Sequence, residues 1–128
     1  MIRFFIFTSI FFLTSCVFDS GNKDLIDGYS LTWIDSKWNQ SIYKGEEQIP
    51  GYIFDVEYND QFIIAKQHPL KNGFYSKPNY EITNFYIIDI TKNKSGYKKG
   101  IFGPMSENDF NELSENLKIK NILKFKKY

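Results

Sequence analysis

Apolar and polar side chains alternate along most of the chain with a period of two residues. This alternation is typical of strands that have one face on a core and the other in water. The segments 29–34, 52–68 and 84–90 show it most clearly, and all three are rich in aromatic and β-branched residues. Shorter strands are predicted at 41–44, 97–102 and 121–127, with a turn at 35–37 and a strand end at Gly103-Pro104.

The segment 52–68 predicts a β-hairpin, with Asn59-Asp60 as a two-residue turn. Alternation then divides its side chains between two faces. The core face carries Phe54, Val56, Tyr58, Ile63 and Ala65. The opposite, wettable face carries Asp55, Glu57, Ile64, Lys66 and His68. By the same rule, Tyr86, Ile88 and Ile90 share one face of the next strand.

One amphipathic helix is predicted near the C-terminus. Ser106 is a favourable N-cap, and Asp109 three residues later completes a weak capping box. Phe110, Leu113 and Leu117 then form an apolar stripe. The predicted fold class is α+β, an antiparallel sheet of about five or six strands with one C-terminal amphipathic helix packed on it.

The N-terminus follows a targeting pattern. Arg3 supplies a positive charge, and residues 4–13 form an apolar block that is too short to span a bilayer. A block of this length is typical of the hydrophobic region of a signal peptide. The block ends in Leu13-Thr14-Ser15-Cys16, which contains the only cysteine of the chain.

Leu13-Thr14-Ser15-Cys16 resembles the lipobox of bacterial lipoproteins, in which an aliphatic residue and two small residues precede a lipid-bearing cysteine. The resemblance implies a signal peptide at 1–15, cleavage between Ser15 and Cys16, and a lipid-bearing thioether on Cys16. Two or more acyl chains anchor a protein stably in a membrane. We therefore expect a polar tether at 16–27, a single domain at 28–128, and a membrane partner reached through lipid on Cys16.

The expected location is the bacterial cell envelope. No Asp follows Cys16 directly, since the next residues are Val17 and Phe18. In lipoproteins of cells with two membranes, an Asp there favours retention at the inner membrane. Its absence favours the outer membrane in such a cell.

Composition limits the remaining choices. The 128 residues carry a formal net charge of +1, so no global field attracts nucleic acid. We expect no nucleic-acid partner, no metal and no cofactor. Aromatic residues make up 19% of the chain, which favours a folded domain over a disordered one.

Residues suited to catalysis are few. His68 is the only histidine, so a catalytic triad would have to combine it with a hydroxyl and Asp55 or Asp89. Asp55, Glu57 and Asp60 cluster around the hairpin, and a pair of them could serve a glycosidase. The simpler interpretation is a strand-end histidine partly in water and acids on a solvated strand face.

Two further groups could bind partners. Lysines crowd the turn at 91–100, where Tyr97 accompanies Lys92, Lys94, Lys98 and Lys99. An aromatic platform could form from Trp33, Trp38, Tyr43, Tyr75 and Tyr80. Most aromatic residues should belong to the core; Trp38 and Tyr75 lie in predicted turns, and with Tyr80 they are the candidate surface contacts.

The run Tyr86-Ile87-Ile88-Asp89, followed by Gly103-Pro104 and a helix containing Phe110, resembles a family of small bacterial lipoproteins classed as domain of unknown function 3997. The likeness extends loosely over 29–119. No activity is known for the family, so the resemblance implies no catalytic residue.

The leading hypothesis is a lipid-anchored envelope protein that is not an enzyme and contacts another envelope protein or a glycan. One alternative is a small envelope hydrolase that uses His68 or the hairpin carboxylates. Another is an immunity or inhibitor lipoprotein that guards the envelope against a toxin.

Overall fold

The computed structural model describes residues 20–73, 76–93, 99–119 and 126–127. Its strands are β1 (Gly21–Asp24), β2 (Ser30–Ile34), β3 (Ser36–Lys44), β4 (Glu46–Ile49), β5 (Ile53–Tyr58), β6 (Phe62–Gln67), β7 (Asn84–Asp89), β8 (Ile101–Met105) and β9 (Lys126–Lys127). One helix, α1 (Glu107–Asn116), follows β8. All of the strand pairs are antiparallel.

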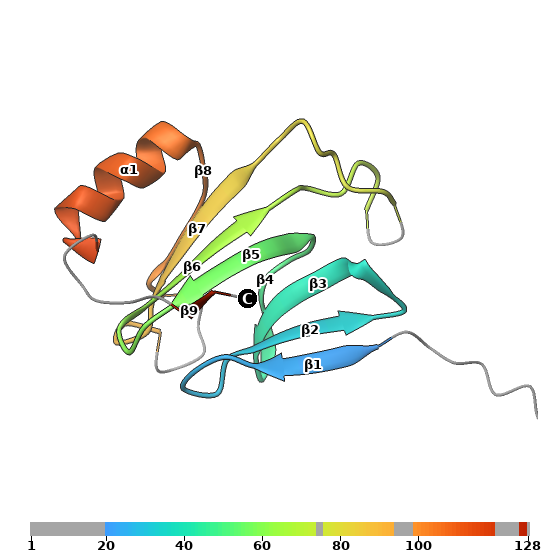
Figure 1. Ribbon diagram of the computed structural model, residues 1–128, viewed down its shortest axis with the longest axis horizontal. Helices are drawn as coiled ribbons and strands as arrows, with labels where there is room; N and C mark the ends of the chain where they lie inside the picture. The colour runs from blue at the N-terminus through green and yellow to red at the C-terminus, as the bar shows by residue number, and fades with distance from the viewer. Residues whose placement is uncertain (1–19, 74–75, 94–98, 120–125, 128) are drawn as a thin grey trace, which may run out of the picture.

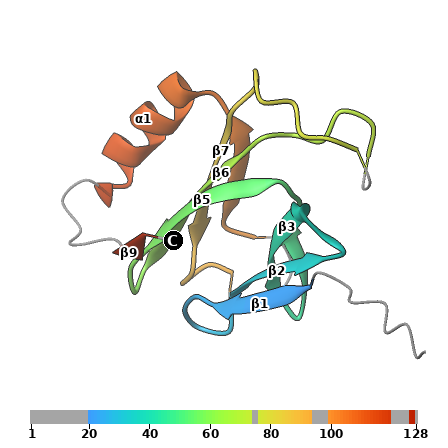
Figure 2. The same ribbon diagram turned by 45° about the vertical axis from the view of Figure 1, so that its right-hand side comes forward.

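The strands form two sheets, with the orders β1-β2-β3-β4 and β8-β7-β6-β5-β9. The smaller sheet faces one side of the larger sheet, and α1 covers part of the other side (Figures 1 and 2). The predicted antiparallel strands and C-terminal helix are confirmed, but the prediction of one sheet is wrong. The alternation of side chains identifies buried faces, whereas it does not say which strands share hydrogen bonds.

The chain passes from one sheet to the other at Pro50-Gly51. A side chain on Gly51 would clash with the backbone of β3, since its Cβ would lie 2.8 Å from the carbonyl oxygen of Trp38. The side chain of Gln40 donates a hydrogen bond of 2.8 Å to the carbonyl of Ile53. The two sheets are therefore in close contact where β5 begins.

The main core fills the space between the sheets. Both sheets contribute to it: Tyr29, Leu31, Ile42 and Ile49 come from the smaller sheet and its flanks, and Ile53, Val56, Tyr58, Ile63, Ala65, Tyr86, Ile88 and Ile90 come from the larger. The predicted inward face of Tyr86, Ile88 and Ile90 is confirmed. A second core lies under α1, where Phe62, Ile87 and Ile119 are buried against Phe110, Leu113 and Leu117 of the predicted stripe.

The hairpin turn lies one residue later than predicted. The backbone N–H of Asn59 donates to the carbonyl of Phe62 at 3.0 Å, so Asp60 and Gln61 are the turn residues. The Asn59 side chain fixes this turn by accepting from the N–H groups of Gln61 and Phe62. Tyr58 consequently pairs with Ile63. This register differs from the predicted one by two residues, so the side chains keep their predicted faces, except for Phe54.

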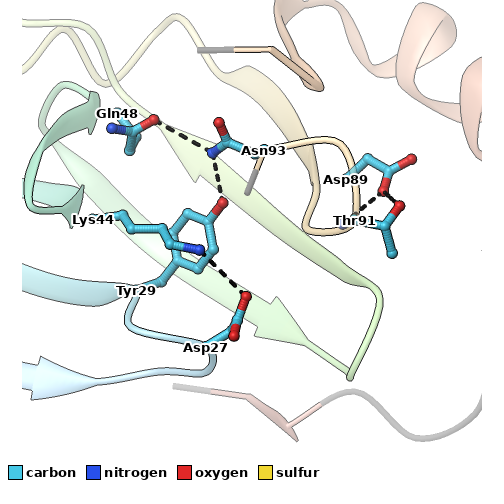
Figure 3. Close-up of polar contacts among 7 residues, drawn as sticks. All are labelled: Asp27, Tyr29, Lys44, Gln48, Asp89, Thr91 and Asn93. Carbon is cyan, nitrogen blue, oxygen red and sulfur yellow. Dashed lines mark hydrogen bonds and ion pairs between the residues drawn. The ribbon is translucent and has the colours of Figure 1, made fainter. Parts of the chain in front are cut away.

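A buried polar link joins the smaller sheet to the segment after β7. Asn93 is fully buried, and its side-chain amide donates to the hydroxyl of Tyr29 (2.5 Å) and the side-chain oxygen of Gln48 (3.4 Å; Figure 3). Burial raises the pKa of Tyr29, and the hydrogen bond from Asn93 partly offsets this effect. Lys44 lies over the Tyr29 ring and pairs with Asp27 at 3.3 Å. Through the hydrogen bond from Asn93, the Tyr29 hydroxyl links the smaller sheet to the segment after β7.

Three boundaries differ from the prediction. The segment that we expected to be a tether through residue 27 contains β1, and Leu25 is buried, so residues 21–25 belong to the fold. Gly103-Pro104 lies within β8 and does not end it. Trp38, predicted in a turn, lies in β3.

Two terminal features match the prediction where the structure describes them. The side chain of Ser106 accepts from the N–H of Asp109 and caps α1. Lys126–Lys127 pairs with β5 at the edge of the larger sheet. In the part of the chain that is described, no helix has the length and apolar character needed to cross a bilayer.

Candidate functional site

The outer face of the larger sheet, turned away from the smaller sheet, is only partly covered by α1 (Figure 1). A groove of about 200 Å³ lies between this face and the first turns of α1. Its lining combines charged, amide and apolar side chains: Asp55, Glu57, Ile64, Lys66, Phe85, Glu107, Phe110 and Asn111. The first four of these residues belong to the wettable hairpin face that the sequence predicts.

Strand register brings the groove's charges together. Asp55 lies opposite Lys66, and Glu57 lies opposite Ile64. Asp55 and Lys66 form an ion pair of 3.6 Å, in which the Asp55 side chain is mostly buried and that of Lys66 is more exposed. Lys66 also lies 5.6 Å from the centre of the Phe85 ring.

The floor of the groove is aromatic. The rings of Phe85 on β7 and Phe110 on α1 stack with their centres 4.9 Å apart. Glu107 lies three residues before Phe110 and four before Asn111, so it shares a helix face with each of them. Three carboxylates and one ammonium group therefore line the groove together with these two rings.

An aromatic cluster continues the outer face beyond the groove. It consists of Tyr52, Phe54, His68 and Tyr80. A bulge between Ile53 and Asp55 makes Phe54 the extra residue in β5, so Phe54 leaves the core face predicted for it. Phe54 stacks on His68 with ring centres 4.0 Å apart, and Tyr80 meets the same ring edge-on at 5.3 Å.

His68 serves the loop after β6. Its Nδ1 lies 2.8 Å from the carbonyl oxygen of Ile82, and its backbone pairs with Tyr52 in both directions. Asp89, one predicted triad partner, lies at the opposite end of the sheet, where it pairs with Phe62 and accepts hydrogen bonds from Thr91 (Figure 3). The structure therefore does not bring His68 and Asp89 together.

The other candidates are separated. Tyr80 is 59% exposed. Trp38 and Trp33 are half-buried on the smaller sheet, Trp33 with Lys37 over its ring, and Tyr43 donates to Glu47. Asp60 is exposed at the hairpin turn, and Lys92 and Lys99 are exposed beyond β7. The candidates outside the described residues are Leu13, Thr14, Ser15, Cys16, Tyr75, Lys94, Tyr97 and Lys98.

Sequence reasoning did not assign Tyr52, Phe54, Phe85 and Phe110 to a candidate site. Phe110 carries a helical core signal and does pack on the second core, but one side of it also forms the groove floor. No sequence signal marks the bulge at Phe54. Among the described residues, no group of three or more His, Cys, Asp or Glu side chains could hold a metal ion.

The fold and this surface define a two-layer antiparallel β domain with one helix on its outer face. The chain belongs to the family described as "Protein of unknown function (DUF3997)", whose model matches residues 21–128. The match begins at the first residue of β1. No curated protein and no solved structure matches the chain.

Proposed function

We propose that this protein is a binding module, not an enzyme, held in the bacterial cell envelope by lipid on Cys16, and that its groove binds a glycan of that envelope. The lipobox-like Leu13-Thr14-Ser15-Cys16 supports the anchor. The observation that carries the binding proposal is the set of carboxylates around the Phe85–Phe110 floor.

Sugar chemistry fits this lining. A sugar ring has a C–H face that packs on an aromatic surface, and its hydroxyl groups donate hydrogen bonds to carboxylates. An amino sugar would add a positive charge, which Glu57 and Glu107 attract. The groove is smaller than the roughly 300 Å³ at which drug-sized ligand sites begin, so it would hold one unit of a longer chain.

The binding proposal is tested by titrating the full-length protein in detergent with soluble glycan fragments released from the cell wall. We expect saturable binding that Glu57→Gln and Glu107→Gln each weaken, because each variant removes a charged acceptor. Glu112→Gln is the matched control, since Glu112 is exposed on the same helix but does not line the groove. Equal binding by all variants, or no binding, contradicts the proposal; capture of an envelope protein that Glu57→Gln abolishes favours a protein partner.

The anchor is tested separately by mass spectrometry of the protein purified from its native membranes. We expect an N-terminal peptide that begins at Cys16 and is heavier by acyl groups. An unmodified thiol at Cys16 contradicts the anchor and the envelope location, and leaves the groove to be judged by its own titration.

One observation favours the hydrolase alternative. Asp55 and Glu57 line the same groove, and a glycosidase needs two carboxyl groups about 5–10 Å apart across the scissile bond. The ion pair with Lys66 occupies one oxygen of Asp55. Chromatography of the glycan fragments after incubation distinguishes the functions: a binding module returns them uncut, whereas a hydrolase yields products that disappear in Glu57→Gln.

A further inference from the structure

Large apolar side chains are exposed at one end of the domain. Within the described residues, Ile34 (49%), Tyr80 (59%) and Ile82 (46%) are the exposed large hydrophobic side chains. Ile34 is the last residue of β2, directly before the turn between β2 and β3, and Tyr80 and Ile82 lie in the loop between β6 and β7. Both connections lie on the right-hand side in both views of the fold (Figures 1 and 2).

A cavity lies between β3, which follows the first of these connections, and the loop after β6, which is the second. It has a volume of about 240 Å³ and is lined by Asn39 and Ser41 of β3, by Glu47 of β4, by Pro50 and Gly51 before β5, and by Leu70 and Gly73 of the loop after β6. The side-chain amide of Asn39 donates to the carbonyl of Ile34 at 3.2 Å, so the cavity connects the loop after β6 with the residue before the β2–β3 turn. We call this region, which also includes the start of β1, the loop end.

The chain enters the fold at the loop end. Gly21, the first residue of β1, pairs with Trp33, which precedes the exposed Ile34. Residues 17–20 separate Gly21 from Cys16. Even when fully extended, that length of chain spans at most about 18 Å. Lipid on Cys16 would therefore keep the loop end next to the bilayer.

The chemistry of the loop end suits a lipid–water interface. Tyrosine is enriched at membrane interfaces because its ring is apolar and its hydroxyl is polar. Exposed lysines at this end can attract anionic headgroups, and they outnumber the exposed acids there. The lysines are Lys37, Lys71 and Lys77, and the acids are Asp35 and Glu81.

The opposite end of the domain differs both in its exposed charges and in its exposed apolar side chains. It comprises the β3–β4 turn, the β5–β6 turn and the segment after β7, and its exposed residues include Glu46, Asp60, Gln61 and Lys92. Within the described residues, this end exposes no large hydrophobic side chain. Exposed apolar residues are thus concentrated where the anchor would be.

The loop that carries Tyr80 and Ile82 is held by hydrogen bonds. The N–H of Asn79 donates to the carbonyl of Pro69 at 2.7 Å, and the N–H of Lys71 donates to that of Lys77 at 3.1 Å. His68 secures the far side of the loop through the Ile82 carbonyl. A surface that is already ordered loses little conformational freedom when it docks.

We infer that the loop end rests on the membrane, with Tyr80, Ile82 and Ile34 in contact with the lipid interface. This inference depends on the proposed anchor at Cys16. It assigns a role to the exposed part of the aromatic cluster, and it leaves the groove on a face that a glycan can reach from the aqueous side.

The test uses the full-length lipidated protein in vesicles of phosphatidylethanolamine and phosphatidylglycerol. Because lipid would occupy the only native cysteine, Tyr80→Cys, Ile34→Cys and Asp60→Cys each introduce a single thiol for a nitroxide spin label. We expect labels at 80 and 34 to collide more often with membrane-dissolved oxygen and less often with a water-soluble nickel chelate than the label at 60. Equal accessibility at all three positions, in protein that floats with the vesicles, overturns the inference but leaves the anchor intact.

Flotation separates the two proposals. Protein that does not float contradicts the anchor and this inference together. In floating protein, the double variant Tyr80→Ser/Ile82→Ser should increase the access of the nickel chelate to a label at position 34 several-fold. Tyr43→Ser is the matched control, because Tyr43 lies at the other end of β3. An unchanged label environment in the double variant also overturns the inference.

Discussion

The two faces of the larger sheet differ in how completely they are covered. On the inner face, Val56, Ile63 and Ile88 pack against the smaller sheet and are at most 1% exposed. On the outer face, α1 packs over Ile64 and Ile87, and the cover ends before Lys66 and His68. The inner face therefore serves as core. On the outer face, the second core ends at Ile64, and two residues later, at Lys66, β6 contributes to the candidate binding surface.

The largest expected effect comes from opening the inner face. Ile88→Ala should lower the free energy of unfolding by about 2–5 kcal/mol, because it leaves a cavity between two packed sheets. Denaturant unfolding followed by circular dichroism measures the loss. Ile82→Ala is the control, since Ile82 is exposed, and it should change stability by no more than about 0.5 kcal/mol. Similar losses in both variants would contradict the division between buried and exposed surfaces.

The next effect concerns the polar link within the same core. Asn93→Ala removes the donor to Tyr29 and Gln48 and should cost about 1–3 kcal/mol, because two buried oxygens lose their partner. Tyr29→Phe removes only the hydroxyl and should cost less. If Asn93→Ala leaves the denaturation midpoint unchanged, the link does not help to hold the layers together.

The inner face was largely predictable from the sequence, because alternation depends only on the period of a strand. Tyr86, Ile88 and Ile90 were placed correctly, and the hairpin faces survived a register shift of two residues. The N-cap at Ser106 was also correct, since capping is a local interaction. The separation into two sheets was not predictable, because hydrogen-bond partners are chosen by contacts between distant segments.

The candidate site was predictable only in part. Asp55 and Glu57 were recognised as neighbours on one face, but their position beside α1 depends on how the helix docks. The bulge that moves Phe54 outward adds one residue to β5 without a glycine or proline to mark it. Tyr80 was recognised as a surface candidate, but its contact with His68 requires the fold of the intervening loop.

A smaller effect is expected from loosening the cover on the outer face. Ser106→Ala removes the cap of α1 and should cost about 1 kcal/mol. Hydrogen exchange should become faster in the first turns of α1 while exchange in β6 changes much less. Asn108→Ala, at an exposed position in the same turn, is the control. Equal acceleration in α1 and β6 would mean that the helix and the inner face unfold as one unit.

The last prediction concerns the stability of the inner face at alkaline pH. Its effect near neutral pH is the smallest of those predicted. Burial raises the pKa values of Tyr29 and Tyr86 above the ordinary value of 10.0. The folded state then holds its phenol protons more tightly than the unfolded state does. Their contribution to stability is therefore complete below about pH 10 and is lost as the pH rises through the folded pKa values.

Denaturant unfolding at a series of pH values between about 8 and 12 measures this dependence. We expect stability to fall above pH 10, and to fall less steeply in Tyr86→Phe, because that variant has one buried phenol fewer to ionise. Tyr86→Phe also loses the hydrogen bond to Gln67, so its stability at pH 8 provides the baseline for comparison. If wild type and variant lose stability in parallel above pH 10, Tyr86 is not among the groups that make the inner face sensitive to alkali.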